Sequence, residues 1–313
     1  MSDYNVYAAR LLPRSEFFTP GHRACQGCGP AIVLRQVAKA LGRNTIVVNA
    51  TGCMEIVVSP FPHSAWEIPW VHTLFENTAA VASGIEAGIK VLARRKRHFT
   101  DSGKINIIAI GGDGSTADIG MGCLSGALER GHDFIYLCYD NEAYMNTGIQ
   151  RSSATPMGAS TTTSPAGKAS KGQFSRKKDL GYIAAAHHIP YVATVTPAHP
   201  FDLIDKLRKA AAVEGPAFIH AFAPCPTGWR CGADTTIKLA RMAVDTGVFP
   251  LYEVVDGKWS LTHEIEDFEP LDEYLFAQGR FRHLKNDAEF VKQLECDVHQ
   301  QYEEIRARTK AGA

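Results

Sequence analysis

The chain of 313 residues has no net charge, because 33 basic residues (Lys and Arg) balance 33 acidic ones (Asp and Glu). A neutral chain lacks the net positive field that draws a protein to nucleic acid or to an anionic membrane. It has no apolar run of the roughly 20 residues that a membrane-spanning helix needs. Residues 1–18 show neither a long apolar core nor a small-residue cleavage site. We therefore expect a cytoplasmic protein with no nucleic-acid or membrane partner.

Three motifs that would assign the cysteines or glycines to a known kind of binding site are also absent. The C-x-x-C pair of Cys25 and Cys28 is not repeated, as it usually is in zinc modules. No C-x-x-C-x-x-C-x-x-x-C-P run of a ferredoxin-type domain occurs, and the G-x-G-x-x-G spacing of dinucleotide-binding domains is missing. Eight cysteines remain to be explained. Disulfides are rare in the cytoplasm, so a metal ion, an iron–sulfur cluster and inert core thiols stay open.

Apolar runs alternate with helical stretches from about residue 30 to residue 225. The runs with the composition of buried strands cover 44–52, 104–114, 133–141, 191–197 and 216–225. The helical stretches cover 31–42, 73–97, 115–131, 182–190 and 199–215. Strands that are apolar throughout are typical of a parallel sheet covered on both faces. We predict an α/β fold with a doubly wound, mostly parallel sheet.

Two segments fall outside this alternation. Residues 151–177 are rich in Ser, Thr, Gly and Pro, which leaves open a mobile surface loop or a functional loop at an active site or interface. Residues 230–313 are charged and aromatic and end in a helical run. We therefore divide the chain into a core domain over 1–229 and a C-terminal extension over 230–313, which packs as an arm on the core or on a partner subunit.

Asp113 and Asn141 each end a predicted strand, and 26 residues separate Gly114 from Asn141, enough for one helix and one strand. Adjacent parallel strands would bring both side chains to the carboxyl edge of the sheet, where ligands of open α/β sheets bind. A helix N-terminus near Ser115 would offer free N–H groups to a diphosphate, and Gly112 would let the backbone approach it. Carboxylate and amide oxygens suit Mg²⁺, which often bridges phosphate to protein. The pattern predicts a magnesium–diphosphate site.

Four cysteines are predicted at the same edge. Cys25 and Cys28 precede the first helix, whereas Cys53 and Cys225 each follow a buried strand. Thiolates from separate loops suit a [4Fe–4S] cluster better than tetrahedral zinc, although residue types alone leave zinc and uncoordinated thiols open. Cys231 competes with Cys225 as the fourth ligand, and spacing does not decide between them. The remaining cysteines are predicted to be inert packing residues in helices or strands: Cys123, Cys138 and Cys296.

Seven segments in chain order resemble one known family. They are CQGCG, NATGC, FPHSAWEIPWVH, FENTAAVASGIEAG, IGGDGSTADIG, YDNEAYMNTGIQRSSATP and APCPTGW. Together they resemble β subunits of pyruvate:ferredoxin oxidoreductases and, more broadly, the thiamine-dependent 2-oxoacid:ferredoxin oxidoreductases. The resemblance covers about residues 16–230 densely and the rest of the chain more loosely. It implies a thiamine diphosphate-binding fold with three cofactors: thiamine diphosphate, Mg²⁺ and a [4Fe–4S] cluster.

The resemblance also implies roles for individual residues. The implied ligands of the cluster are Cys25, Cys28, Cys53 and Cys225. The implied Mg²⁺ ligands are Asp113, Asn141 and the carbonyl of Ala143. Contacts to thiamine diphosphate are implied for Thr51, Gly52, Gly112, Asp113, Gly114, Ser115, Asn141, Asn146 and Thr147. Asn146 falls where the family places a side chain near the thiazolium ring and the substrate, so we expect it to be catalytic.

The family implies oxidative decarboxylation of a 2-oxoacid, with electrons passed through the cluster to ferredoxin. Pyruvate, converted to acetyl-coenzyme A and CO₂, is the expected substrate. An oxalate enzyme, which would not use coenzyme A, and an enzyme for another 2-oxoacid are the alternatives. The activating glutamate, the substrate clamp and the ferredoxin-type clusters are implied to come from partner subunits, so the chain alone is expected to be inactive. A zinc-stabilised structural subunit is the alternative from another functional class.

Overall fold

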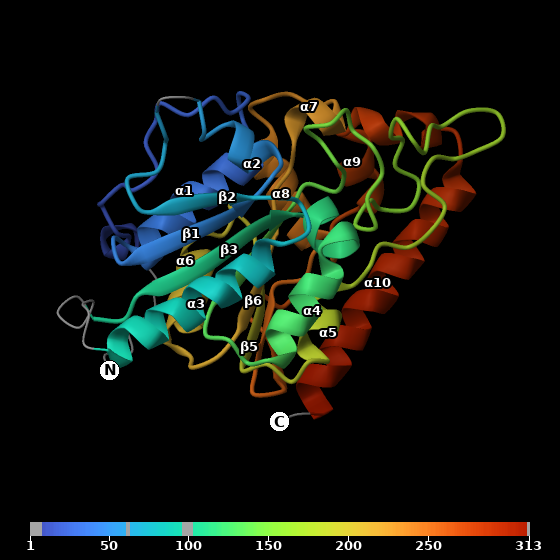
Figure 1. The fold of residues 1–313 in the computed structure, drawn as a ribbon. Coiled ribbons are helices and arrows are strands. Elements are labelled where there is room, and N and C mark those ends of the chain that lie inside the picture. The colour runs from blue at the N-terminus through green and yellow to red at the C-terminus, as the bar shows by residue number, and fades with distance from the viewer. Residues whose placement is uncertain (1–7, 61–62, 96–102, 312–313) are drawn as a thin grey trace.

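In the computed structural model, which describes residues 8–60, 63–95 and 103–311, eight strands form one sheet at the centre (Figure 1). Their order is β2-β1-β3-β4-β6-β5-β7-β8. The strands are β1 (Thr45–Ala50), β2 (Trp70–Thr73), β3 (Asn106–Gly112), β4 (Ile135–Asp140), β5 (Tyr191–Val195), β6 (Ala217–Phe222), β7 (Tyr252–Val255) and β8 (Lys258–Leu261). The first six in sheet order run parallel, whereas β7 and β8 are antiparallel to their neighbours. The predicted doubly wound, mostly parallel sheet is confirmed.

Helices cover both faces of the sheet (Figure 1). One face carries α1 (Gly29–Leu41) and α6 (Pro200–Ala212). The other carries α3 (Thr78–Arg94), α4 (Met121–Glu129) and α5 (Leu180–Ala185). Apolar residues recur in α1 at the helical spacing that places them on one buried stripe: Val33, Leu34, Val37 and Leu41. Burial of such stripes against the apolar strands forms the two layers of the core.

Two elements of the core differ from the sequence prediction. The stretch 73–97 begins its helix only at Thr78, because Thr73 ends the edge strand β2 beside β1 and residues 74–77 form the turn that follows; positions 96 and 97 lie outside the described residues. The helix predicted to begin at Ser115 starts with a π-helical turn over Ser115–Ile119, and α4 follows. Such turns often occur at functional sites, and this one follows directly on the Gly-Asp-Gly turn.

The C-terminal part adds strands to the same sheet. It contains α8 (Thr236–Asp245), β7, β8, α9 (Leu271–Phe276), the 3₁₀-helix η4 (Gly279–Leu284) and α10 (Ala288–Ala311). The final helix was predicted, but the two four-residue strands were not. Tyr302 and Ile305 of α10 are buried, and Tyr302 Oη accepts a hydrogen bond from Ile265 N at 2.7 Å. None of the helices that the structure describes is both long and apolar enough to cross a membrane.

The first part of the loop over residues 151–177 packs closely on the core, whereas residues 167–171 are exposed, and the loop contains none of the helices or strands described above. Ser152, Ala154 and Thr155 are fully buried, and so is Ala159 further along. The loop then leads into α5. The packed part of the loop can present side chains to the neighbouring strand ends, and its functional role stays a prediction.

The remaining short helices lie at chain turns: η1 (Ala9–Leu11), α2 (Cys53–Ile56) and α7 (Pro226–Trp229). Both α2 and α7 follow directly on a parallel strand, β1 and β6 respectively. Figure 1 shows them at the same end of the sheet. This end is the carboxyl edge, where ligands of open α/β sheets bind.

Candidate active site

A cleft of about 320 Å³ opens at the carboxyl ends of β1, β3 and β4. All the residues predicted to contact thiamine diphosphate or Mg²⁺ line it, and they are Thr51, Gly52, Gly112, Asp113, Gly114, Ser115, Asn141, Ala143, Asn146 and Thr147. Cys53, one of the four predicted cluster ligands, also lines it. The remaining lining residues are Phe75, Tyr139, Tyr144 and Met145. The predicted residues therefore lie together in one cleft, and their individual roles stay predictions.

Two positions in the walls of this cleft require glycine. Gly52 has a φ of +152°, and a Cβ there would lie 2.8 Å from the Tyr139 hydroxyl. A Cβ on Gly114 would collide with the ring of Tyr144, whose hydroxyl donates to Gly114 O at 3.0 Å. Any larger residue would displace one of the two tyrosines from the cleft wall.

Three oxygen-bearing groups converge inside the cleft. One atom of the Asn141 amide lies 2.8 Å from the carbonyl oxygen of Ala143 and 3.0 Å from Asp113 Oδ1. If that atom is nitrogen, it donates to both acceptors. If it is oxygen, three oxygens meet with no proton between them, which is unfavourable unless a cation joins them. Neighbouring ligands of an octahedral Mg²⁺ lie about 2.8–3.0 Å apart, given metal–oxygen distances of about 2.0–2.1 Å. The second orientation therefore fits Mg²⁺.

Asp113 depends on Ser152, a loop residue for which no role was predicted. Its side chain is buried, and burial together with the nearby Asp140 raises its pKa well above the ordinary value. Ser152 Oγ donates a hydrogen bond to Asp113 Oδ2. A divalent cation would stabilise the ionised carboxylate and so lower its pKa again. Ser152 thus orients one carboxylate oxygen while Oδ1 faces Asn141.

Four cysteines, which we call the thiol group (Cys25, Cys28, Cys53 and Cys225), come from three loops at this edge. Cys28 is the N-cap of α1, Cys53 begins α2, and Cys225 is the N-cap of α7. Gly29 N donates to Pro224 O at 3.1 Å. That backbone bond ties the start of α1 to the segment that carries Cys225.

The thiols are electrostatic neighbours of one another and of the cleft. The pKa of Cys28 and that of Cys53 are each raised to about 12. Burial is the largest cause, and the neighbouring thiols add to it. Burial also raises the pKa of Cys225. Asp113 contributes to the raised pKa of Cys53. The thiolate form therefore needs compensating positive charge, which iron ions in a cluster would supply.

The spacing of donors bears on which metal group fits. In the part of the chain that the structure describes, no three His, Cys, Asp or Glu side chains converge closely enough to hold one metal ion. A tetrahedral zinc ion needs its sulfur and nitrogen ligands within about 2.0–2.3 Å of a single centre. A four-iron cluster keeps its thiolates farther apart, because irons and sulfides lie between them. The described residues therefore hold no preformed zinc site, and a cluster at the thiol group stays a prediction.

The structure separates Cys225 from its competitor Cys231. Cys225 raises the pKa of Cys28 and of Cys53, whereas Cys231 is not among the causes of either shift. The Cys231 Sγ is 3.9 Å from Pro226 O, and its charged neighbours include Arg280. Cys225 is therefore the better fourth member of the thiol group. The three predicted packing cysteines differ in exposure, since Cys138 in β4 is buried, Cys123 in α4 is half-buried and Cys296 in α10 is exposed.

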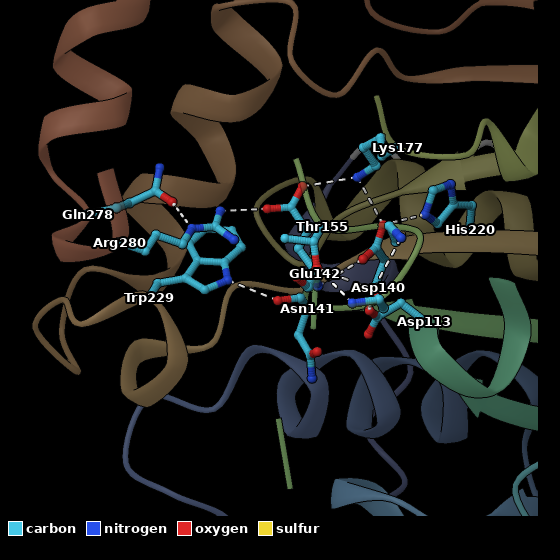
Figure 2. Close-up of polar contacts among 12 residues, drawn as sticks. Asp113, Asp140, Asn141, Glu142, Thr155, Lys177, His220, Trp229, Gln278 and Arg280 are labelled. Carbon is cyan, nitrogen blue, oxygen red and sulfur yellow. Dashed lines mark hydrogen bonds and ion pairs between the residues drawn. The ribbon is translucent and has the colours of Figure 1, made fainter. Parts of the chain in front are cut away.

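Behind the cleft lies a buried set of charges that the sequence did not predict. Figure 2 shows this network of Asp140, Glu142, Lys177, His220 and Arg280. Lys177 Nζ donates to Asp140 Oδ2 at 3.1 Å and to Glu142 Oε1 at 3.0 Å. His220 Nε2 lies 2.8 Å from Asp140 Oδ2, and Arg280 Nη2 donates to Glu142 Oε2 at 2.5 Å. We call these five residues the buried charge network.

Opposite charges stabilise each other within this network. Burial alone would lower the pKa of Lys177, but Asp140 and Glu142 raise it above its ordinary value. Burial would raise the pKa of Asp140, yet Lys177 and His220 lower it below the ordinary range. No local pattern links Arg280 to Glu142 across 138 positions. A charged residue such as Lys177 in a packed loop was the one available signal.

His72 lies beside the cleft, on β2. Its Nε2 is 2.7 Å from the hydroxyl of Thr51, and its Nδ1 is 3.7 Å from Glu55. The Thr51 hydroxyl is also 3.0 Å from Thr73 O, to which it donates. His72 therefore holds the side chain of one predicted cofactor contact.

Comparison with known proteins identifies the family. The model of the thiamine pyrophosphate enzyme C-terminal TPP-binding domain matches residues 50–221. Pyruvate synthase subunit PorB of Methanocaldococcus jannaschii is 55% identical over 276 residues, which are 88% of this chain and 92% of that relative. Ketoisovalerate oxidoreductase subunit VorB of Pyrococcus abyssi is 49% identical over 286 residues, 90% of each chain.

The chain belongs to the family of thiamine diphosphate-dependent 2-oxoacid:ferredoxin oxidoreductase subunits. The resemblance inferred from seven segments is thereby confirmed, and so is the expectation of an enzyme subunit. The solved 2-oxoglutarate:ferredoxin oxidoreductase from Magnetococcus marinus has the same fold, with a TM-score of 0.56 and 20% identity over 74% of this chain and 81% of that one. The predicted thiamine diphosphate-binding fold is confirmed.

Proposed function

We propose that this oxidoreductase subunit binds thiamine diphosphate, Mg²⁺ and one [4Fe–4S] cluster, and that its complex oxidises pyruvate. The observation that carries the proposal is the position of Cys53. Its side chain lines the same cleft as Asp113, and its pKa is raised by the three other members of the thiol group. A cluster at the thiol group would therefore stand directly beside a cofactor in the cleft. The relatives named as pyruvate synthase subunits support pyruvate as the substrate.

Different residues of the cleft would bind Mg²⁺ and the substrate end of the cofactor. Asp113, Asn141 and the Ala143 carbonyl would hold Mg²⁺, which neutralises the diphosphate. Asn146 would contact the substrate end of the cofactor, with Thr147 beside it. Bound thiamine diphosphate supplies an electron sink at its thiazolium ring for cleavage of the bond between carboxylate and carbonyl carbon.

Thr51, Gly52, Gly112, Gly114 and Ser115 would shape the backbone around the diphosphate. Burial of the cleft strengthens each polar contact, because water does not compete with it. The tyrosines packed against Gly52 and Gly114 exclude water from the same wall.

The thiol group would hold the cluster that takes up the electrons. Ferredoxin is their proposed final acceptor, and coenzyme A the acceptor of the acyl group. We assign the activating glutamate, the substrate clamp and the ferredoxin-type clusters to partner subunits, since no motif for them occurs in this chain. The chain alone should therefore be inactive. A cytoplasmic location agrees with its eight free cysteines.

A substrate panel on the intact complex tests the proposal. Pyruvate, 2-oxoisovalerate, 2-oxoglutarate and oxalate are each supplied with and without coenzyme A, and reduction of ferredoxin or a viologen dye is followed. The largest kcat/KM is expected for pyruvate, with coenzyme A required for turnover. Turnover of oxalate without coenzyme A, or of no 2-oxoacid at all, would contradict it. A purified single chain that reduces the dye would contradict the assignment of residues to partners.

One observation favours a second substrate. The ketoisovalerate oxidoreductase relative is 49% identical to this chain, within the same range as the pyruvate synthase relatives at 47–55%. A higher kcat/KM for 2-oxoisovalerate than for pyruvate would select that alternative, with every cofactor assignment unchanged.

A further inference from the structure

Glu142 occupies an unusual place between two proposed Mg²⁺ ligands. It follows Asn141, precedes Ala143 and has a φ of +68°, which side chains other than glycine rarely adopt. It is also buried, with 1% of its surface exposed. In Figure 2 its carboxylate and the Asn141 side chain point in opposite directions. The left-handed residue thus turns its own side chain away from the cleft while its two neighbours face it.

Both carboxylate oxygens of Glu142 are held from outside its own segment. Lys177, in the loop over 151–177, donates to Oε1 at 3.0 Å. Arg280, in η4 of the C-terminal extension, donates to Oε2 at 2.5 Å. Arg280 is itself fixed, because its Nε donates to Gln278 Oε1 at 2.9 Å and its guanidinium lies 3.9 Å from the centre of the Trp229 ring.

The backbone around Glu142 is held as well. Its N–H donates to Asp140 Oδ1 at 2.9 Å, and its carbonyl accepts from Thr155 Oγ1 at 2.7 Å. Trp229 Nε1 donates to the carbonyl of Asn141 at 2.9 Å. The strained conformation therefore persists because the surrounding structure over-determines it, as is usual where strain serves a site.

The charges around Glu142 balance one another without any charged group from the cleft. Asp140 and Glu142 carry two negative charges, and Lys177 and Arg280 carry two positive ones. Because this set balances itself, it has no need of Mg²⁺ for its own stability. Its bonds nevertheless end on Glu142, which lies between Asn141 and Ala143 in the chain.

We propose that Arg280 and Lys177 are positioning residues for the cation site: by holding the two carboxylate oxygens of Glu142, they fix the left-handed turn that aims the Asn141 side chain and the Ala143 carbonyl at Mg²⁺. This inference rests on the proposed function, which places Mg²⁺ at Asp113, Asn141 and Ala143. Arg280 does not line the cleft, so it acts on the cation site through Glu142. The C-terminal extension thereby takes part in cofactor binding.

The test compares three variants of the intact complex: Arg280→Met, Glu142→Gln and the double variant. Arg306→Met is the matched control, because Arg306 also lies in the C-terminal extension and pairs with Glu264 and Glu303 near the surface. Each complex is stripped of metal with a chelator and titrated with Mg²⁺ at saturating thiamine diphosphate. Retained thiamine diphosphate is the binding readout, and the unfolding temperature of the metal-free complex is the stability readout.

Arg280→Met is expected to weaken Mg²⁺ binding about 10- to 100-fold, the usual cost of losing a residue that supports a metal ligand. It also leaves a buried carboxylate half-paired, so its unfolding temperature should fall. The double variant removes both charges and should recover the unfolding temperature while the Mg²⁺ defect remains. Arg306→Met should change neither readout. If Arg280→Met does not assemble, Arg280→Lys makes the same comparison with a smaller shift.

Two results would overturn the inference. In one, Arg280→Met and Glu142→Gln bind Mg²⁺ as tightly as the unaltered complex. In the other, the double variant recovers Mg²⁺ affinity together with its unfolding temperature, which would show a purely structural ion pair. If the unaltered complex retains no thiamine diphosphate in the presence of Mg²⁺, the proposed function itself is wrong, and the inference falls with it.

Discussion

The cation cleft and the thiol group lie at the same edge of the sheet, but they are built differently. In the cleft, Asp113 is held by Ser152 and Asn141 by the groups around it, so the side chains have partners within the chain. In the thiol group, burial and then Cys225 and Cys25 raise the pKa of Cys28 and of Cys53, and neither shift has a cationic group among its causes. The first region is organised before its ligand arrives, whereas the second depends on its ligand for compensating charge.

This difference has a physical consequence for assembly. A preformed oxygen site loses little conformational entropy when Mg²⁺ binds, because its ligands are already placed. Neutral thiols must instead lose protons as iron binds, so cluster insertion is coupled to pH and to the folding of three loops. We therefore expect the two cofactors to be lost independently, with the larger structural change at the thiol group.

Replacement of Cys53 should have the largest effect, since it alone belongs to both regions. Cys53→Ala should reduce dye reduction by 2-oxoacid to background and remove the iron and acid-labile sulfide of one cluster, because the cluster cannot replace a lost thiolate, while the iron of the partners' clusters remains. Thiamine diphosphate content should change little. Iron, sulfide and thiamine analysis of the anaerobically purified complex checks this. Full iron content would refute the assignment of Cys53 to the cluster.

Replacement of Asp113 should have the second largest effect, confined to the cleft. Asp113→Ala removes the one carboxylate among the proposed Mg²⁺ ligands and should weaken thiamine diphosphate binding by more than about 100-fold, above the cost of losing a supporting residue. Iron content should stay that of the unaltered complex. Equilibrium dialysis against thiamine diphosphate with Mg²⁺ measures the affinity. An unchanged dissociation constant would mean that the cofactor assignment is wrong.

Removal of Ser152 tests how far the cleft is preorganised. Ser152→Ala deletes the donor to Asp113 Oδ2 and should weaken Mg²⁺ binding about 10-fold, at the lower end of the range for such partners. Ser153→Ala is the control, because the neighbouring side chain is only half-buried. Magnesium titrations at fixed thiamine diphosphate give both values. Equal affinities in the two variants would show that Asp113 orients itself without Ser152.

The raised pKa of Asp113 predicts a smaller, pH-dependent effect. Because burial and Asp140 raise this pKa, the folded metal-free protein binds the proton more tightly than the unfolded chain does. Its unfolding free energy should therefore fall as pH rises from the ordinary carboxyl pKa of about 3.9 toward the raised value. Mg²⁺ displaces the same proton, so its affinity should fall as pH falls. Titration calorimetry in buffers of different ionisation enthalpy measures the released proton; Asp113→Asn should release less.

Replacement of Cys231 should have the smallest effect, and it tests whether Cys225 or Cys231 is the fourth cluster ligand. Cys231→Ser should leave iron content, sulfide content and activity unchanged, because Cys231, unlike Cys225, is not among the thiols that raise the pKa of Cys28 or Cys53. Cys225→Ser, treated in parallel, should lose the cluster. The reverse outcome in the two variants would make Cys231 the fourth ligand.

Much of the fold and of the cleft could be predicted because the signals are local. Buried strands such as Ile135–Asp140 are continuous apolar runs up to their last residue, and parallel strands must end at one edge, so Asp113 and Asn141 had to meet. Strands β7 and β8 were not predicted, because four residues show too little hydrophobic periodicity to distinguish a strand from a loop. Both are nevertheless part of the sheet.

The support behind the cleft could not be predicted, because it depends on pairing across the whole chain. Glu142 meets Lys177 from the packed loop and Arg280 from the C-terminal extension, and neither residue stands in a motif. The left-handed conformation of Glu142 has no local signal either, since glutamate is not a residue that favours it. Tertiary contacts decide both features.

The central claim is that one chain holds the divalent cation and the cluster side by side. Replacing Mg²⁺ with Mn²⁺ in the intact complex and recording Mn²⁺ electron spin relaxation before and after reduction of the clusters tests it most directly. The account predicts that reduction accelerates Mn²⁺ relaxation and that Cys53→Ala, which leaves the partners' clusters in place, removes most of this acceleration. An acceleration that is absent, or that persists undiminished in Cys53→Ala, would contradict it.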